Sequence, residues 1–207
     1  DPTQLQAWAA EAEAAALAQP GVTQSQSASA AYQSRNMTMA MSNGFAASYA
    51  RTDWHISSVA IAGEGTGMER DYDGDARIFG VDLRTPEEIG RTAGQRAVAR
   101  VGARKPPTGA YPVLFDERIS SSLIGHLLSA ANGAAIARGA SWLLGKEGAE
   151  VLPASLSVLE DPHRARVAAS RPFDGEGLPT AKRALVQDGV LQGWILDLGS
   201  ARQLGLQ

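Results

Sequence analysis

The chain's three histidines are the residues whose types most readily support catalysis or metal binding. They are His55, His126 and His163, and no two of them have the spacing of a metal-ligand pair. A zinc peptidase site on a helix needs two imidazoles about one turn apart and a glutamate that activates water, as in HExxH. No HExxH occurs, and the chain has no cysteine. The residues by themselves therefore predict no metal site.

His126 follows Ser122 by four residues within a segment whose apolar residues recur at helical spacing. Residues four apart lie on one side of a helix, so we expect a hydrogen bond between the Ser122 hydroxyl and the His126 imidazole. A serine and a histidine also suggest a hydrolase, but no Gly-x-Ser-x-Gly nucleophile elbow occurs. The pattern favours a partly buried, structural histidine.

A second candidate is the loop from Ser170 to Gly177, in which Asp174 and Glu176 are two residues apart. In an extended loop these carboxyl groups point to one side and could serve as acid and base together with His126. An exposed turn with solvated carboxylates, or an ion pair of Arg171 with Asp174, explains the same residues without catalysis. Both interpretations stay open at this point.

Acidic residues alternate along the chain at Glu69, Asp71, Asp73 and Asp75. The run lacks the glutamate at the twelfth position of an EF-hand loop, which disfavours a calcium site. Because Asp73-Gly74 is also a turn signal, we expect the run to pass through a hairpin tip and to form a solvent-facing strand surface.

Helical and strand patterns together predict an α+β fold, an antiparallel meander packed with helices and followed by the start of a β-rich C-terminal domain. Asn43-Gly44, Asp73-Gly74 and Asp188-Gly189 are hairpin signals, and Thr85 begins a capping box. The proline-rich connection at 105–109 predicts two domains, 1–105 and 110–207. The individual predictions are helices at 3–19, from 86 onward and at 117–138, and strands at 37–41, 45–49, 55–62, 68–72, 76–79, 111–115, 184–186 and 190–196.

Composition excludes several classes of function. The formal net charge is −3, and no basic cluster interleaves with aromatic residues, so a nucleic-acid partner is not expected. No apolar stretch reaches the length of a membrane span. The absence of cysteine fits a reducing compartment, and we expect a cytoplasmic protein. Because the chain starts at Asp1 and stops without a clear terminal element, we expect it to be a truncated fragment of a longer protein.

Several segments, in order along the chain, resemble the PmbA/TldE branch of the TldD/PmbA family, whose members carry the label modulator of DNA gyrase. The most specific of them is the loop of Arg171, Phe173, Asp174 and Glu176. The resembling segments are Gly67 to Tyr72, Thr85 to Gly90, Tyr111 to Asp116, Ser170 to Gly177 and Ala184 to Leu191.

This resemblance implies a change in a metal motif. In the TldD branch the corresponding helix resembles His-Glu-Ala-Val-Gly-His, whose histidines bind zinc with a distant cysteine while the glutamate activates water. Aligned on its last two residues, this chain has Ser121 for the first ligand and Ser122 for the base, and keeps Gly125 and His126. Residues five apart lie about 140° from each other around a regular helix, so binding would distort it. Because Ser121 replaces the first ligand, no distortion is needed in this chain, and we expect a regular helix here.

The resemblance further implies a non-catalytic subunit. A TldD-like partner would supply zinc, this chain would bind no cofactor, and the pair would process unfolded peptides, with a homodimer possible when the chain is alone. No DNA binding follows from the family label. Two other hypotheses remain: an independent hydrolase that uses His126 with Asp174 or Glu176, and a homomeric binding or assembly protein.

Overall fold

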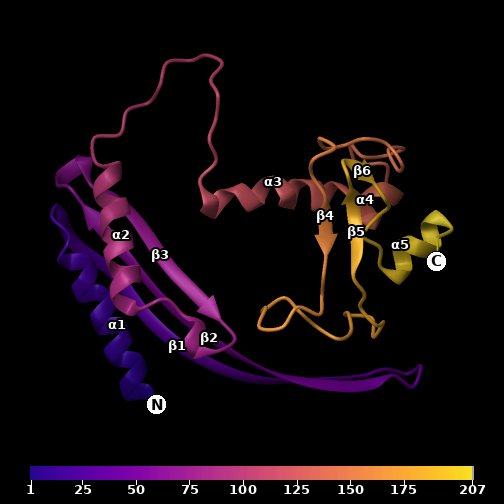
Figure 1. The fold of residues 1–207 in the computed structure, drawn as a ribbon, viewed down its shortest axis with the longest axis horizontal. Helices are drawn as coiled ribbons and strands as arrows, with labels where there is room; N and C mark the ends of the chain where they lie inside the picture. Colours follow the sequence, from indigo (N-terminus) through magenta and orange to yellow (C-terminus); the bar gives the residue numbers. More distant parts are fainter. Residues whose placement is uncertain (207) are drawn as a thin grey trace. The chain divides into compact units, whose positions relative to one another are not determined.

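The computed structural model describes residues 1–206, which form two compact units. Unit 1 comprises residues 1–108 and the short segment 165–168, and unit 2 comprises residues 109–164 and 169–207, of which Gln207 is outside the described residues. Each unit has helices and its own three-stranded antiparallel sheet, so the predicted α+β class is confirmed (Figure 1).

Unit 1 is a two-layer structure in which two helices cover one face of the sheet, whose strand order is β1-β2-β3 (Figure 1). Helix α1 packs over β1 and β2, and α2 packs over β2 and β3. The predicted meander is therefore confirmed. The bounds are α1 Pro2–Leu17, β1 Val22–Ala40, β2 Ala46–Ala62, η1 Gly65–Gly67, β3 Glu69–Arg77, η2 Gly80–Asp82 and α2 Pro86–Arg100.

Small residues let the two helices of unit 1 approach closely. Gly90 of α2 lies so near α1 that a Cβ atom there would overlap the carbonyl oxygen of Ala12, and a Cβ on Gly94 would lie 2.9 Å from the Ala16 oxygen. Alanine side chains fill much of the layer between helices and sheet. Thr85 caps α2 as predicted, since its hydroxyl accepts a hydrogen bond from the Glu88 N–H.

The first hairpin lies where Asn43-Gly44 predicts it, but its loop is longer than expected. The Met41 N–H donates to the Phe45 carbonyl, and the Gly44 N–H donates to the Met41 carbonyl. Only Gly44, at φ +91°, has a positive φ, whereas the expected two-residue turn needs two such residues. The turn is thus a three-residue loop that ends in a left-handed glycine.

The hairpin predicted at Asp73-Gly74 is wrong. Strand β3 runs without interruption through these residues, where Asp73 pairs with Ser58 and Gly74 with Ser57 of β2. The chain instead turns between Ala62 and Glu69, around η1. Gly74 is glycine for a different reason, because a Cβ there would lie 3.1 Å from the Ile56 carbonyl oxygen.

The solvent-facing surface predicted for the acidic run is also wrong. Asp71 and Asp73 are buried, at 6% and 5% relative exposure, on the sheet face that α2 covers. Arg84 and Arg96 each approach Asp73 at 2.7 Å, and Arg100 lies 3.7 Å from Asp71. Arginines from α2 and the preceding segment therefore compensate the buried carboxylates.

Asp75 continues this acidic row. Burial works to raise its pKa, but the Arg84 N–H and the Arg77 guanidinium both bond to the carboxylate and outweigh burial, so the pKa of Asp75 lies below its usual value. The Arg84 side chain, bonded to Asp73, has its pKa raised. The row is a set of structural ion pairs between β3 and the helix layer.

Unit 2 contains a small sheet in the order β4-β5-β6, packed with short helices. The predicted hairpin at Asp188-Gly189 is confirmed, because both residues have positive φ, 50° and 83°, as a type I′ turn requires. Leu143, Val186 and Leu191 lie at the centre of the core, fully buried. The bounds are α3 Glu117–Ala130, α4 Gly133–Ala137, β4 Val158–Glu160, β5 Arg183–Gln187, β6 Val190–Leu191 and α5 Leu198–Leu204.

Two predictions for the start of unit 2 need correction. Residues 111–115 form no strand, because no other strand pairs with them among residues 1–206. The Leu114 side chain in this segment is 98% exposed. The helix predicted at 117–138 is two helices, since α3 ends at Ala130 and the Asn132 side chain caps the start of α4. Along α3 only Leu127 and Ala130 are buried, so the expected buried face is confined to its C-terminal end.

Candidate functional site

The positions of the altered metal motif lie on α3. Asp116 caps this helix by accepting the Arg118 N–H, and α3 continues without a break from Glu117 to Ala130. Ser121 and His126 therefore lie on one regular α-helix, as predicted. Both side chains are exposed.

His126 is a surface residue rather than the partly buried histidine that its spacing suggests. The Ser122 hydroxyl donates instead to the Ile119 carbonyl at 2.5 Å, one turn back along α3. No hydrogen bond of the His126 ring occurs within the described chain, so the expected contact with Ser122 is absent. Serine hydroxyls commonly bond back to the preceding turn of a helix in this way.

The donor groups on α3 do not fit a zinc site. Serine is a poor zinc ligand, so among the motif positions Ser121, Ser122 and His126 only His126 has a strong zinc donor. Among residues 1–206, no group of three or more histidine, aspartate or glutamate side chains is arranged so that it could hold a metal ion. These residues therefore support no metal-dependent step on α3.

The loop of Asp174 and Glu176 is a compact turn within unit 2. Asp174 Oδ1 accepts the N–H groups of Glu176 and Leu178, each at 2.9 Å, and the Asp174 N–H donates to the Leu178 carbonyl at 3.0 Å. Asp174 thus closes the turn by using its side chain as a backbone mimic. The carboxylate is committed to structure.

Glu176 also contacts backbone. Its Oε2 atom accepts the Leu198 N–H at 2.9 Å, at the first turn of α5. A carboxylate at a helix N-terminus satisfies a free amide and interacts favourably with the helix dipole. No hydrogen bond joins His126 to either loop carboxylate in residues 1–206. The carboxylates bond instead to backbone N–H groups, Asp174 within its own turn and Glu176 at α5.

The other two residues of the loop also have structural contacts. Phe173 is buried and pairs with Pro179 across the turn. Arg171 is exposed, its N–H donates to the Pro162 carbonyl, and its own carbonyl accepts the Thr180 hydroxyl at 2.6 Å. It forms no ion pair with Asp174 within the part of the chain that the structure describes.

Sequence patterns gave no signal for the partner of His163. The His163 Nε2 atom lies 3.0 Å from the Thr180 hydroxyl, so the histidine contacts the same turn as Arg171. His163 and Thr180 are 17 positions apart in the sequence, and no local periodicity links them. Only the folded loop brings them together.

Models of two protein domains match the chain almost end to end. The PmbA/TldA metallopeptidase central domain matches residues 1–101, and the PmbA/TldA metallopeptidase C-terminal domain matches residues 108–207. Metalloprotease PmbA of Escherichia coli O157:H7 is 39% identical over 166 residues, which cover 80% of this chain and 37% of that protein. The chain belongs to the PmbA/TldE family.

Other members of the PmbA/TldE family agree with this assignment. A Metalloprotease PmbA homologue of Haemophilus influenzae is 32% identical over 165 residues, 80% of this chain and 37% of that protein. A Bacteroides thetaiotaomicron structure described as a modulator of DNA gyrase has a TM-score of 0.89 at 26% identity, covering all of this chain and 47% of its own. The chain spans less than half the length of each of these relatives.

The fold also occurs at lower sequence identity. TldE from Thermococcus kodakarensis has a TM-score of 0.80 at 18% identity, covering all of this chain and 47% of that structure. This likeness establishes a shared fold. Within residues 1–206, no helix has both the length and the apolar character needed to cross a membrane.

Proposed function

We propose that the chain belongs to a TldE-like, non-catalytic subunit of a cytoplasmic TldD/TldE peptidase. In this proposal a TldD-like subunit supplies zinc, and the TldE-like subunit helps to bind and process unfolded peptides. The single observation that carries it is the regular helix α3, which has Ser121 and Ser122 at the motif positions and retains only His126. The family name metallopeptidase and the TldE fold support the same proposal.

The donor chemistry explains why catalysis is assigned to the partner. A hydroxyl at Ser122 cannot act as the general base at neutral pH, whereas a glutamate can. A hydroxyl at Ser121 leaves His126 without a second imidazole on the helix. The chain therefore lacks both a metal pair and a base at these positions.

An independent hydrolase is the weaker hypothesis. It requires His126 near Asp174 or Glu176, yet Asp174 accepts two amides of its own turn and Glu176 accepts an amide of α5. Their oxygens already have protein donors. The third hypothesis is a homomeric binding or assembly protein, which would pair with copies of itself rather than with a TldD-like subunit.

Purification of the full-length protein, alone and mixed with its TldD-like partner, tests the proposal. We expect no stoichiometric zinc in the isolated protein, about one zinc per complex because only the partner has the ligand set, and peptide cleavage only in the mixture. Elemental analysis and a fluorogenic unfolded peptide provide the measurements. Stoichiometric zinc or cleavage in the isolated protein would contradict the proposal.

His126→Ala separates the remaining hypotheses in the same assay. A non-catalytic subunit should retain complex formation, zinc content and cleavage in the mixture, because His126 is an exposed residue with no described partner. The independent hydrolase should lose its activity. A stable homomer that ignores the TldD-like protein would favour the homomeric hypothesis.

A further inference from the structure

One short segment of unit 1 interrupts the sequence of unit 2. Residues 165–168 belong to unit 1, whereas the residues on either side of them belong to unit 2. We call residues 163–170 the strap loop, with 165–168 as its tip. Among residues 1–206, the tip takes part in no main-chain hydrogen bond. Side chains must therefore hold the tip in unit 1.

Two hydrogen bonds close the base of the strap loop. The Arg171 N–H donates to the Pro162 carbonyl at 2.9 Å, and the Ser170 hydroxyl donates to the Arg164 carbonyl at 2.8 Å. The Arg171 carbonyl in turn accepts the Thr180 hydroxyl at 2.6 Å. Loops whose ends are joined in this way are compact and frequently functional. The base can keep its shape while the tip moves.

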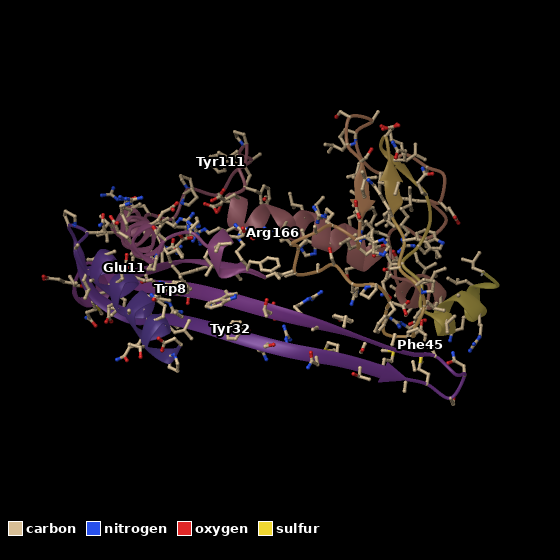
Figure 2. The ribbon with its side chains drawn as sticks, turned by 60° about the horizontal axis from the view of Figure 1, so that its bottom comes forward. Trp8, Glu11, Tyr32, Phe45, Tyr111 and Arg166 are labelled. Atoms are coloured by element: carbon tan, nitrogen blue, oxygen red, sulfur yellow. The ribbon has the colours of Figure 1, made fainter. Side chains whose placement is uncertain are left out.

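A single guanidinium attaches the tip to η2. Arg166 donates to both carboxylate oxygens of Asp82, from Nε to Oδ2 and from Nη2 to Oδ1, each at 2.7 Å (Figure 2). This is a bidentate ion pair, the strongest geometry for arginine and a carboxylate. The same guanidinium lies over the Phe79 ring, 4.6 Å from its centroid, within cation–π range. Phe79 directly precedes η2, so both contacts are made with one short stretch of unit 1.

The backbone of Arg166 has a conformation that arginine rarely adopts. Its φ is +61°, in the left-handed region. Among residues 1–206, the only other non-glycine residue with positive φ is Asp188, whose type I′ turn requires it. Such backbone strain persists where contacts of the folded state compensate it. The contacts of Arg166 with Asp82 and Phe79 provide this compensation, and the strain lowers the net free energy that keeps the tip docked.

Salt can reach the ion pair that holds the tip. The side chains of Arg166 and Asp82 keep 52% and 33% relative exposure. Attraction between such partly exposed charges is screened as ionic strength rises. Together with the strained backbone, this makes docking of the tip a small balance that ionic strength shifts.

We propose that the strap loop is a conformational switch with a docked and a released state. In the docked state, Arg166 binds Asp82 and Phe79. In the released state, the tip leaves η2 while the hydrogen bonds at the base stay formed. Screening or breaking the Arg166–Asp82 pair shifts the loop to the released state. The switch goes beyond the proposed peptidase function and does not depend on it.

Trypsin cleavage of the full-length protein measures the release, because cleavage of a loop that opens rapidly follows the population of its open state. The Arg164–Ala165 bond reports on the strap loop. The Arg104–Lys105 bond, in the exposed connection between α2 and α3, is the internal standard. Mass spectrometry of the fragments gives the ratio of the two cleavage rates, which we call the release ratio.

Two variants remove the contacts of the tip without changing the sequence of the strap loop. Asp82→Asn removes the charge of the ion pair, and we expect the release ratio to rise about fivefold or more. Phe79→Leu removes the aromatic ring, and we expect a rise of about twofold or more. Circular dichroism and thermal melts verify that both variants fold.

Asp53→Asn is the matched control. It removes the ion pair of Arg35 with Asp53, which is also in unit 1 and whose carboxylate has 30% relative exposure, close to the 33% of Asp82. The release ratio should stay unchanged in this variant. Raising sodium chloride from about 0.05 M to about 0.5 M should increase the release ratio of the parent and have little effect on that of Asp82→Asn.

Several results would overturn the inference. One is an equal release ratio in the parent and in Asp82→Asn, whether cleavage at Arg164 is fast or absent in both. Others are an equal rise in Asp53→Asn, or a salt effect of the same size in the parent and in Asp82→Asn. None of these results affects the proposed function. Zinc in the isolated full-length protein would instead remove the proposed function and leave the switch intact.

Discussion

At the scale of single residues, the carboxylates that look catalytic in the sequence are structural in the fold. Asp174 accepts two N–H groups of its own turn, and Glu176 accepts the Leu198 N–H of α5. His126, the third candidate, is exposed on α3. These contacts give both loop carboxylates a part in the local structure of unit 2.

Replacement of Asp174 should destabilise unit 2. Asp174→Ala leaves the Glu176 and Leu178 amides without their acceptor, and we expect a loss of about 1–3 kcal/mol in the free energy of unfolding. Urea unfolding followed by tryptophan fluorescence measures it. Asp174→Asn, which keeps an acceptor oxygen, should cost less. An alanine variant as stable as the parent would show that water replaces the carboxylate without penalty.

At the scale of elements, close approach rather than large side chains joins α1 to α2. Gly90 is buried where a Cβ atom would overlap the Ala12 carbonyl oxygen. On α3, by contrast, a Cβ on Gly125 would meet no atom within 4 Å. Substitution of Gly90 and of Gly125 by alanine is therefore expected to change the stability of the protein in opposite directions.

Gly90→Ala should destabilise unit 1 by about 1–3 kcal/mol, because the helices must separate, and this cost should exceed the gain in helix propensity of up to about 1 kcal/mol. Gly125→Ala is the matched control and should stabilise the chain by up to about 1 kcal/mol. Urea unfolding by far-ultraviolet circular dichroism compares them. A stabilised Gly90 variant would contradict the close packing of α1 and α2.

At the scale of the whole molecule, the chain is two units with different means of stabilisation. Unit 2 has a core of large apolar residues such as Leu143, Leu191 and Trp194. The helix and sheet layers of unit 1 meet through alanines and through carboxylates of β3 that pair with arginines. Acid is therefore expected to affect the ion pairs of unit 1 directly.

Asp75 gives this acid response a defined sign. Its pKa is below the ordinary 3.8, so its contribution to stability is fully present above pH 3.8 and is lost as the pH falls through the lower, folded-state pKa. Asp75→Asn should therefore lower stability at about pH 6, and its difference from the parent should shrink toward pH 3. Urea unfolding at both pH values measures this, with exposed Glu11→Gln as control. A difference that is independent of pH would contradict it.

Local chemistry made several elements predictable from the sequence. Thr85 caps α2, and Asp188-Gly189 forms its two-residue turn, because each depends on hydrogen bonds or φ values of neighbouring residues. The motif helix is regular across Ser121 and His126 for the same reason. Residue types alone also determined that α3 has neither a second imidazole at Ser121 nor a general base at Ser122.

Partners distant in sequence decided the rest. Asp73-Gly74 has the composition of a turn, but pairing with Ser58 and Ser57 and the approach of Arg84 and Arg96 make it part of a buried strand face. His163 meets Thr180 only through the folded loop. The sequence by itself determined the composition of the motif helix and the local turns, whereas burial and ion pairing depend on which distant residues come together, and only the tertiary structure decides that.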